Sequence, residues 1–352
     1  MRTLNRSKIA GLIVVSSFIL SACSSDNGTA TDSARPPSDS GDSAPVDERT
    51  LTFGFLYADT HAHNTCGATA LVDVLESRPE AGLTLDIFPG GQLGNEAEMA
   101  EAVVLGDQEM GLAGPNYLAE YHEPLSGIEL AFLYNDMDHV NRVMNGEIGQ
   151  DLLGATEQAT GLKILGTWMI GNWQVYSDKP IRHPDDLAGL NLRMPPSRLM
   201  QANGSAMGAN PTPVAFGEVY LALQQGVVDA ASTTLGLADD MSWYEPVNYV
   251  SMVGGIWSDV PVIMNQGVWD SLNPTQQEAL QAAVDTASDR IQECINEQED
   301  AILARWVEQG QVEVIPREEI DIDAFRENAR QLLIDEFGDW VEEIYDRIRG
   351  MA

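Results

Sequence analysis

Basic residues are scarce in this sequence. Its 352 residues include 19 lysines and arginines against 54 aspartates and glutamates, which gives a formal net charge of −35 at pH 7. Lysine occurs only at Lys8, Lys163 and Lys179. A nucleic-acid-binding surface needs clustered basic side chains to neutralise phosphates, so the composition argues against a nucleic-acid partner. An acidic surface with few lysines keeps a protein hydrated in strong brine, and we expect a salt-tolerant, halophilic source.

Long apolar runs are also missing, apart from one near the N-terminus. Ile9–Leu20 is almost uninterrupted and follows the basic residues Arg2, Arg6 and Lys8. This run is too short for a membrane-spanning helix but is typical of the core of a signal peptide. No later run is long and apolar enough to cross a membrane.

The end of this apolar run is similar to a bacterial lipobox. Leu20-Ser21-Ala22-Cys23 places small residues before a cysteine. We predict a lipoprotein signal peptide over residues 1–22 and lipidation at Cys23; the alternative is an ordinary signal peptide that a cysteine follows by chance. Residues 23–48 are rich in Ser, Asp, Gly and Pro without a hydrophobic period, so we expect a disordered tether. The protein would then be an extracytoplasmic, membrane-anchored lipoprotein, in the periplasm or on the outer face of the cytoplasmic membrane.

Cysteine and histidine are the next rarest reactive residues. After Cys23 only Cys66 and Cys294 remain, and the sequence leaves open whether they pair. Two of the five histidines lie in Asp59-Thr60-His61-Ala62-His63, which follows an apolar strand expected over 51–58. In an extended chain His61 and His63 would share a face and could bind one metal, as in a metal-dependent hydrolase. Further ligands at strand ends are not recognisable in the sequence, so we predict no metal.

Strand-like and helix-like segments alternate along the remaining residues, which is the pattern of an α/β fold. The roughly 300 residues exceed one typical domain, so we expect two lobes. Helices are expected over 139–160 and 325–348. A third, over 274–309, begins with the cap pair Asn273-Pro274 and is long enough to run from one lobe to the other.

Residues 184–235 carry the most informative motifs. "DLAGLNLRMP" (186–195) and "MGANPTPVAFGEVYLALQQGVVD" (207–229) resemble the substrate-binding proteins of TRAP transporters (tripartite ATP-independent periplasmic transporters), of the dicarboxylate-binding type. "FPGGQLGNEAEM" (88–99) and "IELAFLYND" (128–136) are similar to two earlier stretches of the same family. The resemblance therefore covers essentially the whole mature domain in the right order.

The resemblance implies a two-lobed periplasmic-binding-protein fold, the Venus flytrap, with a long helix spanning both lobes. Lobe I would comprise residues 49–170 and about 259–298, and lobe II residues 171–258 and about 299–352. The family binds a solute between the lobes and delivers it to a membrane permease made of a small and a large subunit. No reaction, metal or organic cofactor is implied, and we expect a monomer.

The family pattern also suggests ligand-binding residues. Arg193 occupies the position of the arginine that binds the ligand's carboxylate, and a guanidinium matches the two oxygens of such a group. Phe216 matches a ring that packs on the ligand. Trp173 stands where some relatives carry a second arginine, and Thr233 stands where an asparagine is expected, so Arg193 is the one cation expected there. The remaining candidates are Asn95, Gln174 and His61.

We therefore predict a solute-binding protein that captures a small carboxylate-bearing organic acid, such as a sugar acid or a hydroxy or keto acid, and is not an enzyme. Two alternatives remain at this stage. One is a metal-dependent hydrolase that uses Asp59, His61 and His63. The other is a binder of a zwitterionic, ectoine-like osmolyte with the same fold.

Overall fold

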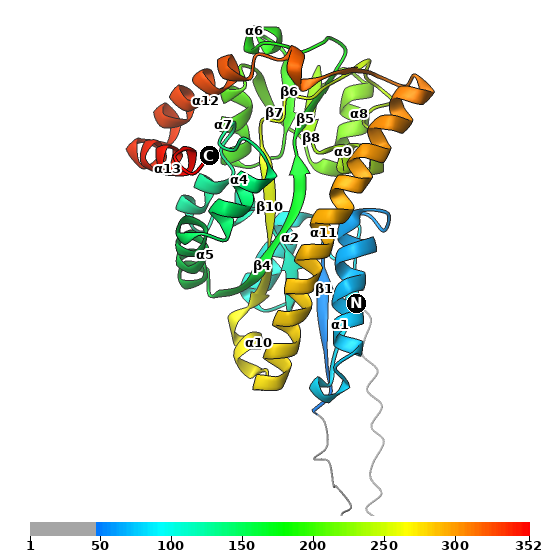
Figure 1. Ribbon diagram of the computed structural model, residues 1–352, viewed down its shortest axis with the longest axis vertical. Coiled ribbons are helices and arrows are strands. Elements are labelled where there is room, and N and C mark those ends of the chain that lie inside the picture. The colour runs from blue at the N-terminus through cyan, green and yellow to red at the C-terminus, as the bar shows by residue number, and fades with distance from the viewer. Residues whose placement is uncertain (1–46) are drawn as a thin grey trace, which may run out of the picture. The chain divides into compact units, whose positions relative to one another are not determined.

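The computed structural model describes residues 47–352, which form an α/β fold with two sheets, one in each lobe (Figure 1). The expected signal peptide, Cys23 and nearly all of the expected tether lie outside the described residues. Within residues 47–352 no helix is both long and apolar enough to cross a membrane.

The first sheet has the strand order β2-β1-β3-β10-β4. Its strands are β1 (Arg49–Gly54), β2 (Leu83–Phe88), β3 (Met110–Leu112), β4 (Leu162–Asn172) and β10 (Trp257–Asn265). β1 pairs in parallel with β2 and β3, whereas β10 runs antiparallel to β3 and β4. Leu51 and Phe53 alternate along β1 and are fully buried, as expected for a strand with one face in the core.

The second sheet has the strand order β11-β9-β5-β8-β6-β7. Its strands are β5 (Gln174–Ser177), β6 (Asn191–Met194), β7 (Asn210–Pro213), β8 (Ala230–Thr233), β9 (Tyr249–Ser251) and β11 (Glu313–Ile315). The sheet is mixed: β6 pairs in parallel with both neighbours, and β5 is antiparallel to β8 and β9. Arg193 lies on β6 opposite Thr212 and Ala231, so a rigid backbone holds it.

Helices cover both sheets and connect them. The α-helices other than α11 are α1 (Thr69–Glu76), α2 (Glu96–Leu105), α3 (Pro115–Leu118), α4 (Met137–Met144), α5 (Glu147–Thr160), α6 (Pro184–Leu187), α7 (Arg198–Ala206), α8 (Val219–Gln224), α9 (Leu235–Asp240), α10 (Gln266–Ser271), α12 (Ile322–Phe337) and α13 (Asp339–Arg349). The shorter turns are η1 (His63–Ala68), η2 (Pro79–Ala81), η3 (Glu123–Ile128), η4 (Phe216–Glu218) and η5 (Arg317–Glu319). Near the C-terminus, α12 packs on α7 and α13 packs on η3.

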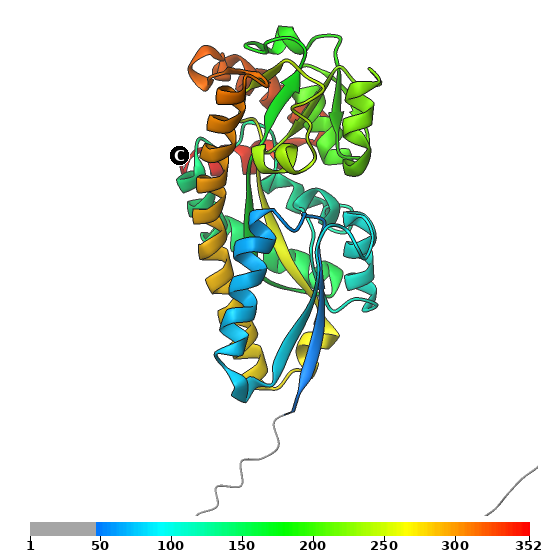
Figure 2. The same cartoon turned by 90° about the vertical axis from the view of Figure 1, so that its right-hand side faces the viewer.

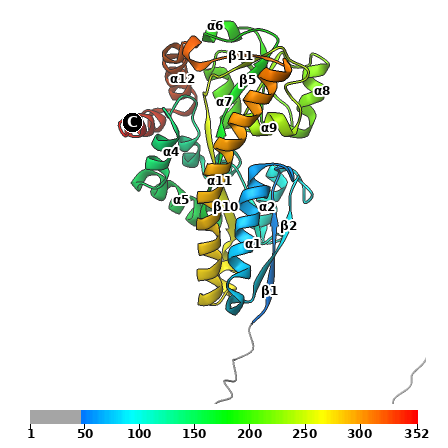
Figure 3. The same cartoon turned by 45° about the vertical axis from the view of Figure 1, so that its right-hand side comes forward.

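The long helix α11 (Pro274–Gln309) has the bounds that the sequence predicts. Asn273 and Gln276 form a capping box at its start, and Gly310 ends it with a φ of 62°. It lies beside α1 and β4 in the first lobe and beside α9 in the second (Figures 2 and 3). A disulfide between Cys66 and Cys294 joins η1 to this helix.

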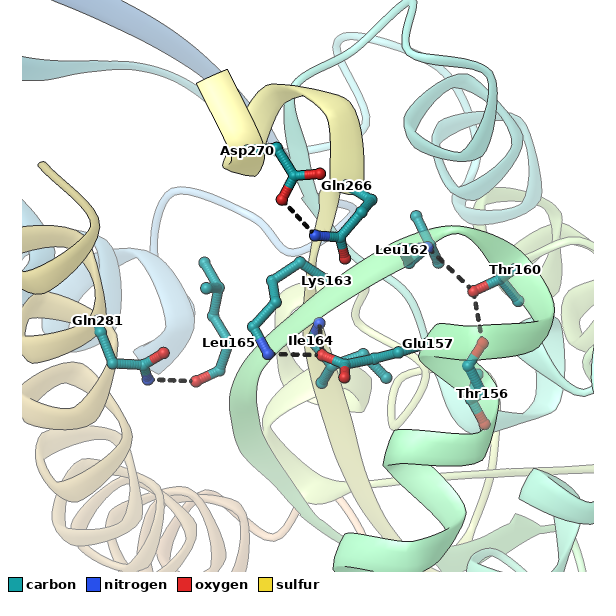
Figure 4. Close-up of polar contacts among 10 residues, drawn as sticks. All are labelled: Thr156, Glu157, Thr160, Leu162, Lys163, Ile164, Leu165, Gln266, Asp270 and Gln281. Carbon is teal, nitrogen blue, oxygen red and sulfur yellow. Dashed lines mark hydrogen bonds and ion pairs between the residues drawn. The ribbon is translucent and has the colours of Figure 1, made fainter. Parts of the chain in front are cut away.

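The start of β4 is fixed to two helices, as Figure 4 shows. Lys163 forms an ion pair with Glu157 of α5, whose carboxylate also accepts a hydrogen bond from the backbone N–H of Ile164 at 2.8 Å. Gln281 of α11 donates to the carbonyl of Leu165 at 2.6 Å. β4 therefore begins in a well-anchored region and ends, at Asn172, where the chain enters the second sheet.

Two predicted helices are each divided in the structure. The one expected over 139–160 is α4 and α5, separated at Asn145 and Gly146, and the one expected over 325–348 is α12 and α13, separated at Gly338 with a φ of 93°. Glycine is a poor helix former at both breaks, and at Gly338 it also adopts a positive φ that other residues disfavour.

The strand predicted over 51–58 is also shorter than expected, because β1 ends at Gly54. The segment with His61 is a turn, and His63 begins the π-helix η1. The prediction that both histidines share the face of an extended strand is therefore wrong.

Candidate functional site

A small cavity of about 50 Å³ lies where the ends of strands from both sheets meet. This is compact next to the roughly 300–1,000 Å³ of typical ligand pockets. Its lining residues are Leu56, Tyr57, Glu96, Gly114, Asn116, Glu129, Ile170, Trp173, Arg193, Pro195, Phe216, Thr233, Leu237, Ser258 and Val260. Four of the residues selected from the sequence are among them: Arg193, Trp173, Phe216 and Thr233.

Arg193 is the one cation in this lining. Its side chain is only 2% exposed, its Nε donates to the carbonyl of Val214 at 3.0 Å, and the guanidinium lies 5.1 Å from the ring centroid of Trp243. Burial lowers its pKa to about 10, which still leaves it charged at neutral pH. Among the described residues no carboxylate forms an ion pair with it. A buried cation without such a partner is costly, and an anionic ligand would offset that cost.

Trp173 begins a chain of hydrogen bonds along one wall of the cavity. It lies between β4 and β5, and its Nε1 donates to the Oγ of Ser258 at 2.9 Å. Ser258 in turn donates to the carboxylate of Glu129. The other Glu129 oxygen accepts from the backbone N–H of Asn116 at 3.1 Å. The indole is thereby fixed in place with its ring at the cavity.

The backbone at Glu129 is also held in place, by the side chain of Asn203. Asn203 of α7 is fully buried, donates to the carbonyl of Glu129 at 2.9 Å and accepts from the N–H of Ala131 at 2.9 Å. The Glu129 side chain is 2% exposed, and burial raises its pKa to about 8, although the bond from Ser258 opposes the shift.

Glu96 is the second carboxyl group at the cavity. It is the first residue of α2, and one of its oxygens accepts from the N–H of Gly114 at 2.6 Å. Burial raises its pKa to about 7. Gly114 leaves room for these groups, because a Cβ at that position would lie 3.1 Å from the Glu96 carboxylate and would collide with the side-chain oxygen of Asn116.

Asn95 and Gln174 do not line the cavity. Asn95 is exposed and caps α2: its side chain accepts from the N–H of Glu98, and the Glu98 carboxylate accepts from the N–H of Asn95. Gln174 bonds the carbonyl of Asn172 and the N–H of Gly254 at the crossing between the lobes. Asn95 thus positions its neighbour Glu96. Gln174 fixes the backbone at Asn172 and Gly254 by hydrogen bonds.

His61 also lies outside the lining, behind Tyr57. It is 2% exposed, its ring stacks on Tyr57 at 5.1 Å, and its Nδ1 is 3.0 Å from that of His63. Burial lowers its pKa to about 3, so the imidazole is neutral at neutral pH. Across residues 47–352 no group of three or more His, Cys, Asp or Glu side chains is placed to hold a metal ion. His61 and His63 are thus part of a packed aromatic cluster with Tyr57 and Trp168, whereas Asp59 is exposed.

Phe216 and Thr233 belong to the second lobe. Phe216 is half-buried in η4 and packs against Trp243, with 5.3 Å between the ring centroids. Thr233 ends β8, opposite Gln174 of β5. Both residues line the cavity together with Arg193 of β6.

Sequence reasoning missed the two acidic residues of the cavity. Glu129 lies in the apolar run "IELAFLY", and a lone carboxylate among buried residues is unusual enough to have marked it. Glu96 follows Asn95, whose capping role would have placed it in the first turn of a helix. Tyr57, Asn116 and Ser258 carry no such signal.

Comparison with known proteins identifies the family. The profile of the bacterial extracellular solute-binding protein family 7 matches residues 57–338. The chain is 29% identical to a sialic acid-binding periplasmic protein of Vibrio cholerae over 77% of this chain and 83% of that protein. It is 30% identical to a 2,3-diketo-L-gulonate-binding periplasmic protein of Escherichia coli over 79% of this chain and 83% of that protein.

Solved structures agree with this match. A TRAP periplasmic solute-binding protein from Polaromonas sp. JS666, bound to D-erythronate, has a TM-score of 0.79 and 27% identity, covering 86% of this chain and 98% of that one. Another from Roseobacter denitrificans, bound to 3-deoxy-D-manno-oct-2-ulosonic acid, has a TM-score of 0.78 and 28% identity, covering 87% and 100%. These relatives are solute-binding proteins rather than enzymes. This chain therefore belongs to the bacterial extracellular solute-binding proteins of family 7, and is of the TRAP type.

Proposed function

We propose that this protein captures a small carboxylate-bearing organic acid in the cavity at Arg193 and delivers it to a TRAP membrane permease. The observation that carries the proposal is the buried guanidinium of Arg193, which lines the cavity and has no carboxylate partner among the described residues. A carboxylate matches its paired N–H donors. The sugar acids bound to the two solved relatives support the same class of ligand.

The proposal extends to the setting of the protein. We infer a signal peptide over residues 1–22, a lipid anchor at Cys23, a tether over 23–48 and a monomer that works beside the membrane in strong salt. We also infer that the protein catalyses no reaction. The lobes proposed from the sequence divide near residues 170, 258 and 298, and closure about these crossings would enclose the ligand.

A thermal-shift screen over organic acids, sugar acids and zwitterions, run at high salt, tests the proposal. We expect at least one carboxylate to raise the melting temperature and Arg193→Gln to remove that effect. Arg290→Gln, an exposed position on α11, is the matched control and should respond like the parent protein. A ligand without an acidic group, or a carboxylate whose effect survives Arg193→Gln, would refute the role of Arg193.

A further inference from the structure

One acidic side chain near the crossing between the two lobes lies outside the cavity. Glu299 of α11 does not line the cavity at Arg193, and among residues 47–352 it forms no ion pair. Its Oε1 atom is fully enclosed, and no donor in the described part of the chain bonds it. A buried carboxylate without a donor or a cation is unfavourable when ionised. The surroundings of Glu299 therefore favour the neutral acid.

Elements of both lobes enclose this carboxyl group. The helix α11 runs past both sheets (Figure 3), where it contacts β4 of the first sheet and α9, which follows β8 of the second. A Cβ on Gly171, near the end of β4, would lie 2.7 Å from the Oε1 atom of Glu299 and 3.6 Å from the Cβ of Thr234. Thr234 is the N-cap of α9. Glu299 thus occupies a space that both lobes bound.

Gly171 also lies where the backbone passes from one sheet to the other. Its φ is 121°, which other residues rarely adopt, and β5 of the second sheet begins at Gln174. Movement of two lobes changes the backbone angles at such crossings. Because Gly171 leaves the room that Glu299 fills, the same movement would change how far the carboxyl group is enclosed.

The charged groups around Glu299 do not neutralise it. Arg305, the next cation along α11, pairs with Asp239 of α9. Arg317, at the crossing beside Gly254, donates to the carbonyl of Val253 at 2.7 Å. The other titratable groups on the surrounding elements are Asp300 on α11, Asp240 on α9, Tyr176 on β5, and Asp59 and His61 on the turn after β1.

The ionisation of Glu299 is shifted accordingly. Burial, followed by the negative charge of Asp300, raises its pKa from 4.5 to about 7. The charge of Glu299 in turn adds to the burial that raises the pKa of Tyr176. Both effects disfavour an ionised Glu299 in the enclosed arrangement.

We propose that Glu299 makes closure of the lobes depend on pH, by taking up a proton from solvent when the lobes close and releasing it when they open. This inference goes beyond the proposed function, with which it shares the premise that the lobes move. It assigns a regulatory role to a residue that does not touch the ligand.

The direction of the effect follows from the two environments of Glu299. The enclosed carboxyl group has a pKa of about 7, and contact with water returns it toward the ordinary 4.5. The contribution of Glu299 to closure is therefore complete below about pH 4.5 and is lost as the pH rises through about 7. Capture of a ligand is thus favoured at acidic pH, and its release at neutral to alkaline pH.

Small-angle X-ray scattering of the ligand-free protein at pH 5 and pH 8, at constant ionic strength, tests this coupling without a ligand. We expect the parent protein to be more compact at pH 5. Glu299→Gln, which is isosteric with the neutral acid, should be more compact than the parent at pH 8 and should change less between the two pH values. Glu297→Gln, exposed on the same helix, is the matched control and should behave like the parent. Identical scattering of the parent and Glu299→Gln at both pH values would overturn the proposal.

Titration calorimetry with the carboxylate that the thermal-shift screen yields measures the same coupling through affinity. From pH 5 to pH 7 the affinity of the parent should fall roughly tenfold more than that of Glu299→Gln. Measurements at pH 6 in buffers of different ionisation enthalpy count the protons, and the parent should take up roughly one more than the variant. Glu96 and Glu129 are present in both proteins, so the difference between the proteins isolates Glu299. Equal proton uptake would contradict the proposal.

The outcomes separate this inference from the proposed function. If a carboxylate binds through Arg193 with equal proton uptake in both proteins, the proposed function stands and the coupling at Glu299 fails. If no carboxylate binds, the proposed function fails, and the scattering of the ligand-free proteins still decides the role of Glu299.

Discussion

The indole of Trp173 is held at the cavity by a hydrogen-bond chain rather than by packing alone. Its Nε1 donates to Ser258, which donates to Glu129, and the ring itself is 6% exposed. A residue fixed in this way can present a flat apolar face to a ligand without losing conformational freedom on binding.

Trp173→Phe should therefore weaken ligand binding by roughly fivefold, about 1 kcal/mol, because Ser258 loses its donor and the wall loses its anchor. Titration calorimetry with the ligand from the screen measures this change, and urea unfolding checks that the fold is intact. Unchanged affinity in a stably folded variant would show that the chain does not position the ring.

Glu129 gives the ligand-free protein a characteristic pH dependence. Its folded pKa, about 8, is raised above the ordinary 4.5 by burial, and Glu96, Asp259, Tyr57 and Tyr134 lie around it. The stability that this group contributes is complete below about pH 4.5 and is lost as the pH rises through about 8. The neutral imidazole of His61 contributes nothing to changes above pH 7.

Between pH 7 and pH 9 we expect the melting temperature of the ligand-free protein to fall, and to fall less in Glu129→Gln, which cannot ionise. Thermal unfolding followed by circular dichroism at constant ionic strength measures both curves. Parallel curves for the two proteins would mean that Glu129 is already ionised at pH 7.

At the scale of elements, helix α9 meets the turn after β1 very closely. A Cβ on Gly236 would lie 3.3 Å from the Nε2 of His61, and Thr60 of the same turn donates to Asp240 at 2.6 Å. The two contacts join the first lobe to the second beside Tyr57. His61 thus lies at the contact between the two lobes, although it does not line the cavity.

Gly236→Val should hinder this approach and reduce ligand affinity by roughly tenfold, with little effect on the stability of either lobe. Small-angle scattering with and without ligand would show reduced closure. Gly217→Val, at an open position, is the control. Equal ligand affinity in both variants would show that the larger side chain at position 236 does not hinder the approach of α9 to the His61 turn.

The disulfide between Cys66 and Cys294 ties η1, just after the His61 turn, to α11. It closes a loop with a sequence separation of 228 residues, so its loss should lower stability by roughly 2–4 kcal/mol. Urea unfolding of the double variant Cys66→Ala, Cys294→Ala measures this. Free thiols detected in the native, unreduced protein would contradict the pairing.

Local signals decided which elements the sequence could predict. The bounds of α11 follow from Asn273-Pro274 at one end and Gly310 at the other, which are strong capping residues. The breaks at Gly146 and Gly338 were missed because the apolar spacing continues across them. The pairing of β10 with β3 and β4 joins residues far apart in the chain, which no local pattern shows.

At the site, too, residues within local motifs could be predicted, whereas residues brought together by folding could not. Arg193 and Trp173 stand within family-like motifs, and both lie at the cavity. Glu96 of α2 and Glu129, which follows η3, come together only in the lining of the folded cavity. Asn95 looked like a ligand-binding residue because its motif lies near the cleft, but its side chain is used in a helix cap.

At the scale of the whole molecule, the site exists only where the two lobes meet. Arg193 comes from β6 of the second sheet, whereas Ser258 comes from β10 of the first sheet and Glu96 from α2, which packs on β3 and β10. Asn203 of α7 adds a direct link to the backbone at Glu129. A ligand that contacts residues from both sheets would therefore stabilise the closed arrangement, which couples capture to domain movement.

The most direct test of this account is a crystal structure of the protein with the tightest ligand from the screen. The account predicts the ligand in the cavity between the lobes, with its carboxylate accepting paired hydrogen bonds from the Arg193 guanidinium. A ligand bound elsewhere, or one whose carboxylate is held by other groups while Arg193 contacts only protein, would contradict it.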